Sequence, residues 1–393
     1  MVINMCEYNN VPKIRFKGFT DVWEQRKFEN IFNYERPDKY IVNSTEYLEF
    51  GPTPVLTANK AFILGYTTEK NKYVNSHESI IFDDFTLDTK FVDFPYMVKS
   101  SAIKILTLKD EKKDNIRFNF ELLSNHRFNM LGHARHYISV VQPEKVFTTN
   151  KQEQNKIGEL FTNIDNLITL HQRKCDTLVN AKKSLLEKMF PKNSSNIPEI
   201  RFKEFTDVWE QRKLTDFVEF YNGQTYSPLN VQENGTLVLR SSNVQNGEIS
   251  KDDSVFIDSR VVNTDNVKIG DIIVVVRNGS RNLIGKHAQI KEKMPNTVIG
   301  AFMTGIRTDN SNFVNSLLNT PIFDNEINKN MGATINQITG YMFSNIEFKI
   351  PTNDEQNKIG KLFEQIDNLI TLHQRKLEKL KNIKKSMLDK MFV

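Results

Sequence analysis

The chain has 393 residues, of which 39% are hydrophobic and 26% charged, and a formal net charge of +5. Its length indicates two or more globular domains, and its mild basicity is compatible with nucleic acid as a partner. The two cysteines, Cys6 and Cys175, make a disulfide framework or a zinc cluster unexpected and are typical of a cytoplasmic protein. No segment is apolar over the length of a membrane span, and the start lacks the pattern of a signal peptide.

The N-terminal segment contains a block that occurs twice. Residues 12–27 read PKIRFKGFTDVWEQRK, and residues 198–213 differ from them only where Lys13 and Gly18 are replaced by glutamate. Its aromatic residues have basic neighbours, so the block predicts either a segment that caps a domain or a surface for a partner. The partner-binding candidates are Phe16, Phe19, Trp23, Phe202, Phe205 and Trp209.

The first centre, residues 28–150, alternates short strand patterns with turns. Strands are expected at 54–57, 79–82 and 102–108. Loops on a rigid sheet commonly carry recognition, and Arg, Lys, Asn and His side chains suit base edges and phosphates. The DNA-binding candidates here are Arg36, Lys39, Tyr40, Asn59, Lys60, His133, Arg135 and His136. The paired Asp83 and Asp84 are expected to be solvated turn residues.

A helix of about 38 residues, about 57 Å long, is predicted over 151–190. Asn150 and Glu153 form a capping-box pattern at its start, and Pro191 ends it. Apolar residues recur in steps of four and three, which is typical of a coiled-coil seam. The same seam recurs in the last segment, 351–393, after Thr352 and Glu355. The predicted seam residues are Ile157, Phe161, Ile164, Ile168, His171, Leu178, Ile359, Phe363, Ile366, Ile370, His373 and Leu380.

Between the helices lie a linker with the repeated block, 191–213, and a second centre, 214–350. Strands are expected at 236–240, 254–257, 271–277 and 346–350, separated by Asn-Gly turns. The DNA-binding candidates of this centre are Arg240, Ser242, Asn243, Arg277, Asn278, Arg281, Asn336 and Gln337. For each single residue, a solvated polar turn is the alternative interpretation.

The two helices are predicted to pair with each other in an antiparallel orientation, because the first leads from the first centre to the second and the other runs back. Two separate amphipathic helices, each packed on its own domain, are the alternative. In the paired arrangement, polar seam residues such as His171 and Lys182 are expected to set the register or to be satisfied within the core, rather than to bind a metal. The predicted fold is α+β, with two loop-rich mixed α/β domains separated by a two-helix coiled coil in a pseudo-twofold repeat.

Motifs for catalysis are missing from the sequence. There is no phosphate-binding GxxxxGK[ST] loop, no GxGxxG after a strand and no [DN]PP[YF] motif, and no histidine–cysteine set has zinc spacing. The prediction is therefore a chain without catalytic or metal-binding residues.

Two divergent centres, each followed by a long helix that opens with EQNKIG at Glu153 and Glu355, resemble the specificity subunits of type I restriction–modification systems. The resemblance covers essentially the whole chain. It implies that 28–150 and 214–350 are target-recognition domains, that 151–190 and 351–393 are constant helices, and that 1–27 and 191–213 are constant segments.

The resemblance further implies a split double-stranded DNA target, with one half read by each domain and a spacer set by the helices. The implied partners are two methyltransferase (modification) subunits and optionally two restriction subunits, with no membrane. S-adenosylmethionine, ATP and Mg²⁺ would belong to those partners. A stand-alone two-headed DNA-binding protein, or a protein scaffold without nucleic acid, are the alternative classes; the first would bind its site tightly alone, and the second would show no steep salt dependence on DNA.

Overall fold

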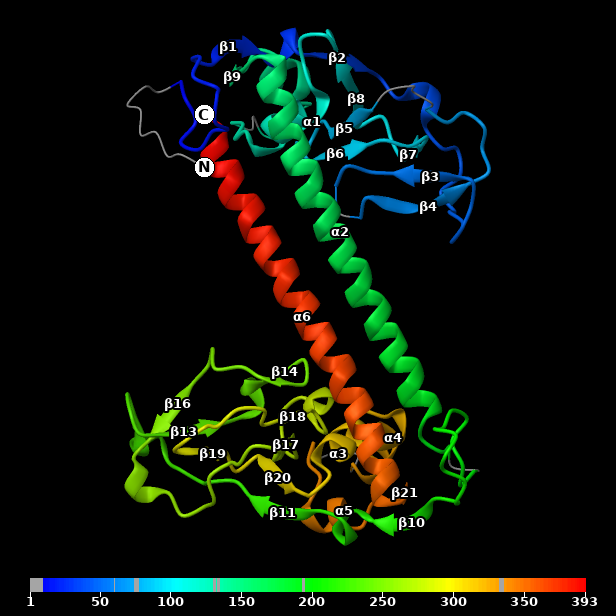
Figure 1. Ribbon diagram of the computed structural model, residues 1–393, viewed down its shortest axis with the longest axis vertical. Helices are drawn as coiled ribbons and strands as arrows, with labels where there is room; N and C mark the ends of the chain where they lie inside the picture. Colours follow the sequence, from blue (N-terminus) through cyan, green and yellow to red (C-terminus); the bar gives the residue numbers. More distant parts are fainter. Residues whose placement is uncertain are drawn as a thin grey trace. The chain divides into compact units, whose positions relative to one another are not determined.

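The computed structural model describes residues 10–59, 61–73, 78–129, 132, 135–192, 195–331 and 336–393. The chain divides into two compact units (Figure 1). Unit 1 comprises Met1–Gln172 and Arg375–Val393, and unit 2 comprises Arg173–Gln374. Each unit therefore contains one sheet domain and one half of each long helix.

Unit 1 is built on short strands because its sequence alternates apolar runs of four to six residues with turns. Its four-stranded sheet has the order β2-β8-β5-β6, a three-stranded sheet has the order β4-β3-β7, and β1 pairs with β9. The elements are β1 (Glu24–Lys27), β2 (Phe32–Glu35), β3 (Thr53–Leu56), β4 (Ile63–Thr67), β5 (Ser79–Asp83), β6 (Thr89–Val92), β7 (Met97–Val98), β8 (Ile103–Leu108), α1 (Ile116–Asn125) and β9 (Lys145–Thr148).

Unit 2 has a four-stranded sheet of order β11-β20-β17-β18, a second of order β12-β16-β13-β19, and two strand pairs, β10-β21 and β14-β15. Its strands are β10 (Glu210–Lys213), β11 (Glu219–Asn222), β12 (Val231–Gln232), β13 (Thr236–Leu239), β14 (Val244–Gln245), β15 (Glu248–Ile249), β16 (Val255–Ile257), β17 (Ile272–Val275), β18 (His287–Gln289), β19 (Thr297–Ile299), β20 (Met303–Arg307) and β21 (Glu347–Ile350). Its short helices are α3 (Ser311–Leu318), α4 (Pro321–Asn330) and α5 (Gly340–Ser344).

The two units share one sheet plan despite their unlike centres. The central strand β5 pairs with β8 so that Asp83 faces Ile103, and β17 pairs with β20 so that Val275 faces Met303. In both units the repeated EQRK strand pairs antiparallel with the strand just before a long helix. Every strand expected from the sequence is confirmed within one or two residues at its ends.

The long helices are α2 (Lys151–Lys188) and α6 (Asn353–Met391), of 38 and 39 residues. Inside unit 1, the last part of α6 packs against the first part of α2: Phe392 contacts the ring of Phe161, with centroids 5.9 Å apart. Inside unit 2, the last part of α2 packs against the first part of α6, where the rings of Phe190 and Phe363 are 6.3 Å apart. Within each unit the paired halves therefore run antiparallel, as predicted.

The core of each unit combines a sheet domain with both helix halves. In unit 1, Trp23, Phe118, Phe161 and Phe392 belong to one buried cluster, and in unit 2 Trp209, Phe313, Phe363 and Phe190 form its counterpart. Burial of such aromatic side chains contributes about 1.5–3 kcal/mol each. The α+β fold with two mixed domains and an internal repeat is thus confirmed. Among the described helices, none has the length and apolarity that a bilayer crossing requires.

Candidate nucleic-acid interface and partner frame

The repeated block and the start of each long helix together form the frame of each unit. The most buried charges of this frame lie where each long helix begins. Arg15 donates two hydrogen bonds to the Glu153 carboxylate, at 2.6 and 2.8 Å, and Arg201 does the same to Glu355 at 2.8 and 2.7 Å. The predicted cap is confirmed at Asn150, whose side chain accepts from the Glu153 amide at 3.0 Å. The carboxylates of Glu153 and Glu355 accept from arginine side chains. The repeated block and the repeated helix are therefore bonded to each other in both units.

The glutamine that follows in each copy of the EQNKIG motif attaches the sheet domain. Gln154 accepts from the Asn115 amide at 2.8 Å, where α1 begins, and Gln356 accepts from the Asn310 side chain at 3.1 Å, where α3 begins. Both glutamines are buried. Because a buried amide without a partner is costly, these bonds fix how each helix meets its sheet domain.

The glycine of the motif allows the closest approach. A Cβ at Gly158 would lie 2.6 Å from Asn115 Oδ1, and a Cβ at Gly360 would lie 2.7 Å from the Phe313 backbone nitrogen. A side chain cannot fit at either position without movement of backbone or cap. Glycine in a helix costs about 1 kcal/mol relative to alanine, so its presence in both copies reflects this contact.

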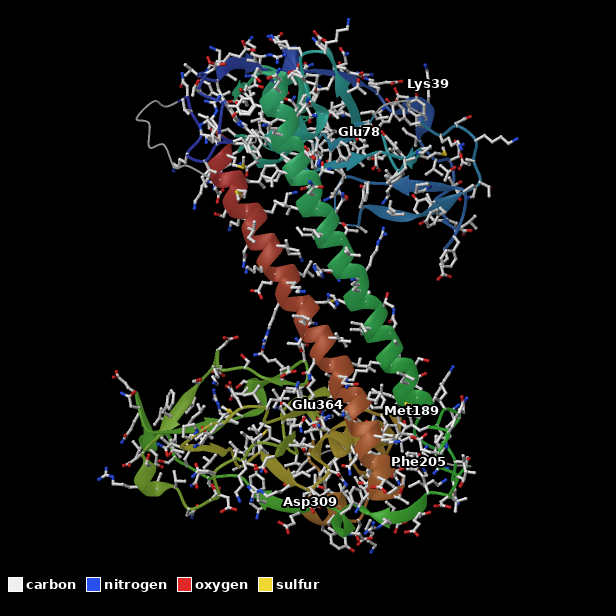
Figure 2. The ribbon with its side chains drawn as sticks, in the orientation of Figure 1. Lys39, Glu78, Met189, Phe205, Asp309 and Glu364 are labelled. Atoms are coloured by element: carbon white, nitrogen blue, oxygen red, sulfur yellow. The ribbon has the colours of Figure 1, made fainter. Side chains whose placement is uncertain are left out.

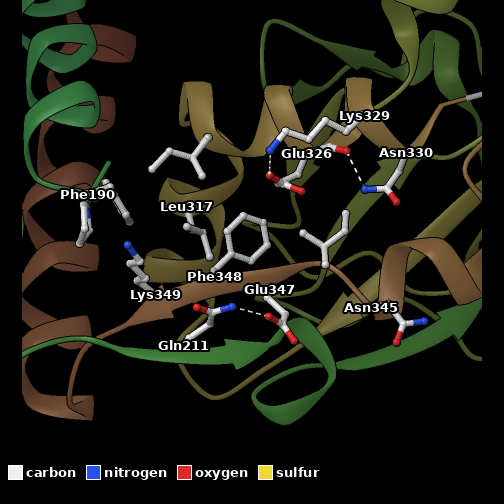
Figure 3. Close-up of a pocket in the computed structure, with 13 residues that line it drawn as sticks. Phe190, Gln211, Leu317, Glu326, Lys329, Asn330, Asn345, Glu347, Phe348 and Lys349 are labelled. Atoms are coloured by element: carbon white, nitrogen blue, oxygen red, sulfur yellow. Dashed lines mark hydrogen bonds and ion pairs between the residues drawn. The ribbon is translucent and has the colours of Figure 1, made fainter. Parts of the chain in front are cut away.

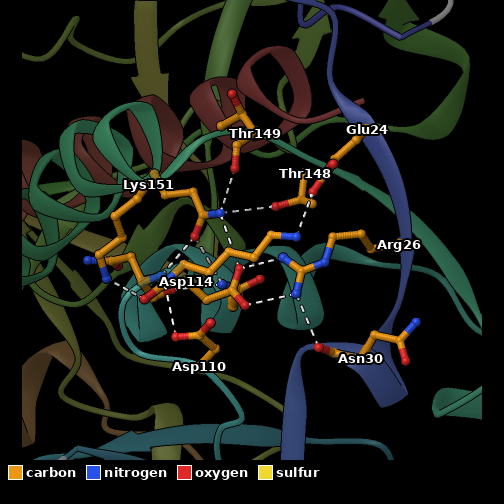
Figure 4. Close-up of polar contacts among 12 residues, drawn as sticks. Glu24, Arg26, Asn30, Asp110, Asp114, Thr148, Thr149 and Lys151 are labelled. Carbon is orange, nitrogen blue, oxygen red and sulfur yellow. Dashed lines mark hydrogen bonds and ion pairs between the residues drawn. The ribbon is translucent and has the colours of Figure 1, made fainter.

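One frame contact differs between the units; Figure 4 shows its form in unit 1. In unit 1, Arg26 donates to both oxygens of the buried Asp114, at 2.6 and 2.9 Å, and Lys151 donates to the Asp114 carbonyl. In unit 2, the equivalent Arg212 donates to the Asp216 carbonyl at 3.2 Å. The frame thus tolerates a local difference where it meets a divergent centre.

The aromatic residues of the repeated block divide into two groups. Trp23 and Trp209 are only 2% and 1% exposed, so the prediction that their indoles face a partner is wrong: they fill the cores beside the helix starts. The four phenylalanines of the block are half-buried. Lys156 lies 5.2 Å from the centroid of the Phe19 ring, and Lys358 lies 5.3 Å from that of Phe205. These phenylalanines remain the reachable part of the predicted partner surface, next to the exposed Val22 and Val208.

The three candidate loops of the second centre come together in space. Asn278 donates to the Ser241 hydroxyl at 2.9 Å, which joins the loop after β17 to the loop after β13. Asn336 donates to the Gly279 carbonyl at 2.9 Å, and Gln337 pairs with Arg277 as a β-bridge. The two hydrogen bonds join residues 37 and 57 positions apart in the sequence, so the loops form one surface at the end of the central strand.

Within this surface some candidates are already used internally. Asn243 is fully buried and bonds to the Arg240 amide and to the Ser250 and Asp253 carbonyls, so the prediction that it reads bases is wrong. The Arg240 guanidinium donates to the Asp253 carboxylate at 2.7 Å. The exposed candidates of this surface are Ser242, Arg277 and Arg281, with Asn278, Asn336 and Gln337 half-buried.

In the first centre, a pair of buried carboxylates organises the candidate loops. Asp83 and Asp84 are 4% and 2% exposed, which corrects the expectation of solvated turn residues. Asp83 accepts from the Asn59 side chain at 3.2 Å, and Asp84 pairs with Lys104 at 3.0 Å. His136 is 1% exposed. Its amide donates a hydrogen bond to the Asp84 carbonyl, and its ring nitrogen Nδ1 lies 3.2 Å from the same oxygen. His136 is therefore a structural residue, which corrects its assignment to DNA.

The other candidates of the first centre lie on the surface or outside the described residues. Arg36 and Lys39 are exposed, and Figure 2 shows the Lys39 side chain projecting from unit 1. Tyr40 donates a hydrogen bond to Glu35 at 3.1 Å. The pKa of Tyr40 is raised, mainly by burial and also by the neighbouring Glu35 carboxylate. Lys60 and His133 lie outside the described residues, while Arg135 is exposed.

The predicted seam residues are buried or half-buried in their own units, with Ile157, Phe161, Ile359 and Phe363 at most 2% exposed. The seam lysines have equivalent partners: Lys182 binds Asp367 at 2.6 Å inside unit 2, and Lys384 binds Asp165 at 2.8 Å inside unit 1. His171 and His373 are half-buried and have interaction partners of their own. Over the described ranges, no group of three or more potential metal ligands is found.

A pocket of 470 Å³ lies in unit 2 among β10, β21, α3 and α4 (Figure 3). Its polar side chains bind one another: Gln211 donates to Glu347, and Lys329 binds Glu326 at 2.6 Å. Such mutual pairing leaves these carboxylates occupied, and the pocket lies on elements other than the clustered candidate loops.

Each of the two sheet domains has divergent end loops and is attached by the same frame to one half of each long helix. This arrangement defines a class of duplicated two-domain recognition proteins. A family model described as the type I restriction modification DNA specificity domain matches residues 206–382. Two curated relatives extend the likeness over the rest of the chain. The Type I restriction enzyme EcoR124I/EcoR124II specificity subunit of Escherichia coli is 26% identical over 86% of this chain and 85% of its own length.

The Type I restriction enzyme MjaVIII specificity subunit of Methanocaldococcus jannaschii is 24% identical over 99% of this chain and 97% of its own length. A crystal structure of the Type-I restriction-modification system S subunit from M. genitalium has the same fold, with a TM-score of 0.66, 15% identity, and coverage of 98% of this chain and 99% of that one. Residues 206–382 thus match the model of this DNA specificity domain, and the chain as a whole is similar to specificity subunits of type I restriction enzymes.

Proposed function

We propose that each unit reads one half of a bipartite DNA target with the loops at the end of its central strand, and that the paired helices set the spacer between the halves. The observation that carries this proposal is the shared frame: the same Arg–Glu, Gln–Asn and glycine contacts hold two sheets of the same order whose end loops differ. A constant frame that carries variable loops supports two domains that recognise their half-sites independently.

The division of labour between residues follows from their chemistry. Lysine and arginine contacts to phosphates supply affinity that falls steeply with salt, and loop side chains in the major groove supply sequence choice. In unit 2 the surface formed by the loops after β13 and β17 with residues 336–337 is the proposed reading surface. In unit 1 the loops joined by Asp83 and Asp84 take this role.

The frame would recruit two methyltransferase subunits, and optionally two restriction subunits, through equivalent surfaces. Phe19 with Val22 in unit 1, and Phe205 with Val208 in unit 2, are apolar groups that remain reachable beside the buried tryptophans. In this proposal the chain itself is not catalytic and acts in the cytoplasm. S-adenosylmethionine, ATP and Mg²⁺ would be bound by the partners. Native mass spectrometry of the saturated complex should give two methyltransferases per chain; one per chain would contradict two equivalent surfaces.

The independence of the readers is tested by exchanging residues 214–350 for the corresponding centre of another specificity subunit. The sites methylated by the complex should then change in one half only, because unit 1 is untouched. A change in both halves would contradict independent readers.

The spacer is tested by lengthening both helices where the units meet in the chain, with four residues after Arg173 and four after Arg375. Both helices must be lengthened because each unit contains half of each. One added turn is about 5.4 Å, so the preferred spacer should grow by one or two base pairs. Both half-sequences should stay the same. An unchanged spacer in a map of methylated sites would contradict the proposal.

A further inference from the structure

Each unit carries an exposed phenylalanine with an arginine over its ring, at the same end of its four-stranded sheet. Arg135 lies 5.8 Å from the centroid of Phe85, and Arg277 lies 5.1 Å from that of Phe302. The phenylalanines are 42% and 53% exposed, so both rings are open to a partner from outside the chain. Two unrelated loops have thus arrived at one arrangement.

The sheet register shows that one member of each pair occupies a corresponding position. Asp83 ends β5 and Val275 ends β17, and both face the first residue of the neighbouring strand. Phe85 and Arg277 each lie two residues beyond these strand ends, so phenylalanine takes this position in unit 1 and arginine in unit 2. Their partners come from unlike positions: Phe302 directly precedes β20, whereas Arg135 lies in the segment before Tyr137.

The backbones of both members are anchored. In unit 1, Asp83 accepts from the amides of Phe85 and Thr86, each at 3.0 Å, and Asp84 accepts from the Tyr137 amide at 2.8 Å, two residues after Arg135. These bonds explain why two adjacent carboxylates are buried at this strand end.

In unit 2 the anchoring is direct. The amides of Val276 and Arg277 both donate to the Phe302 carbonyl, at 3.0 and 3.2 Å. The bridge between Arg277 and Gln337 holds the strand end from its other side. The backbone positions of both residues are therefore fixed by main-chain bonds.

These two arginines differ from the other arginines that lie over aromatic rings in what their guanidinium groups bind. Arg117 and Arg307 also lie over aromatic rings, but each also binds a carboxylate. Across the described parts of the chain, the guanidinium groups of Arg135 and Arg277 have no hydrogen-bond or ion-pair partner. Each guanidinium lies over a ring, and its N–H groups have no protein acceptor in the described parts of the chain.

A planar guanidinium with a free edge suits the O6 and N7 atoms of guanine, which it can bind with two parallel hydrogen bonds. We propose that Arg135 and Arg277 each read a guanine in the half-site of their own unit, with Phe85 and Phe302 as positioning residues that hold the guanidinium plane. This assignment rests on the proposed function and adds to it the base type and the residues that select it.

The test uses the full chain in complex with its methyltransferase subunits and a binding selection on randomised DNA duplexes. Arg277→Lys keeps the charge but loses the planar pair of donors. The expected result is a loss of guanine preference at one position of one half-site, on the order of 10- to 100-fold. Phe302→Leu should give a smaller loss at the same position, and Arg135→Lys should act on the other half-site.

Arg260→Gln is the matched control in unit 2, because Arg260 is 86% exposed and already binds Asp258 at 2.7 Å. It should leave every base preference unchanged. An Arg277→Lys variant that binds with unaltered base preference would overturn the inference, since lysine replaces arginine equally well at a phosphate. The unfolding midpoint of each variant, followed by tryptophan fluorescence, separates misfolding from altered reading.

The same experiment distinguishes failure of this inference from failure of the proposed function. If the unaltered complex selects a two-part motif and the lysine variants select it too, only the arginine assignment falls. If the unaltered complex selects no two-part motif, the proposed function itself falls.

Discussion

Replacing Glu355 by glutamine tests how strongly the frame depends on its buried ion pair. The Glu355 side chain is 1% exposed and that of Arg201 is 12% exposed, and two hydrogen bonds of 2.8 and 2.7 Å join them. Glutamine keeps the shape but leaves the arginine charge without its counter-charge. Breaking a buried pair by changing one partner costs about 3–5 kcal/mol, which is about two to three and a half powers of ten in the unfolding equilibrium.

The unit 1 pair should be more sensitive than the unit 2 pair. Glu153 accepts from Arg15 and also from the Trp23 indole at 3.3 Å and the Thr149 hydroxyl at 2.5 Å. In unit 2 the position equivalent to Thr149 is proline, and the buried Trp209 indole has no hydrogen-bond partner among the described residues. Glu153→Gln should therefore cost more than Glu355→Gln.

The chain offers a direct assay because it has two tryptophans, one in each unit. In a Trp23→Phe background, fluorescence reports urea unfolding of unit 2 alone, and in a Trp209→Phe background it reports unit 1. Glu204→Gln is the control, because Glu204 and Lys358 are about half exposed and an exposed pair contributes about 0–1 kcal/mol. If Glu355→Gln shifted the unit 2 midpoint no more than Glu204→Gln, the reasoning about buried charge would be refuted.

Three further predictions concern the helices and the sheet of unit 2. Gly360→Ala should destabilise unit 2 by about 1–3 kcal/mol despite the better helix propensity of alanine, because its Cβ meets the Phe313 backbone; a raised urea midpoint would contradict this. Burial lowers the pKa of His287 below its usual 6.5, so unit 2 should lose stability as the pH falls below about 6.5, and His287→Asn should flatten that loss in pH-dependent melting. A double-mutant cycle on Lys182 and Asp367 should give a coupling of about 0.5–1 kcal/mol that shrinks in high salt.

The linkage for His287 has a defined sign. The unfolded chain binds a proton near pH 6.5, whereas the folded unit binds it only at a lower pH. Between those values the unfolded state holds more protons, so stability rises with pH and is complete above the ordinary histidine value.

Local patterns were enough to predict the repeat, the two long helices and several of the strands. A seam of apolar residues every three or four positions implies a helix with a partner, and Asn150 and Pro191 mark its ends because capping and proline chemistry act within a few residues. The strand at 272–275 was equally clear, because a run of β-branched residues between turns strongly favours a β-strand. These features depend on neighbours along the chain.

Tertiary structure decided which polar residues are available to a partner. Asp83 and Asp84 look like turn residues, but the sheet buries them and uses them to hold loops more than 50 residues away. Trp23 and Trp209 look like surface anchors, but the helix starts cover them. Burial depends on which distant elements pack together, and the pattern of a single segment carries no record of that. For the same reason the meeting of Arg277 with Phe302 is set by the register of β17 and β20, which only the folded sheet determines.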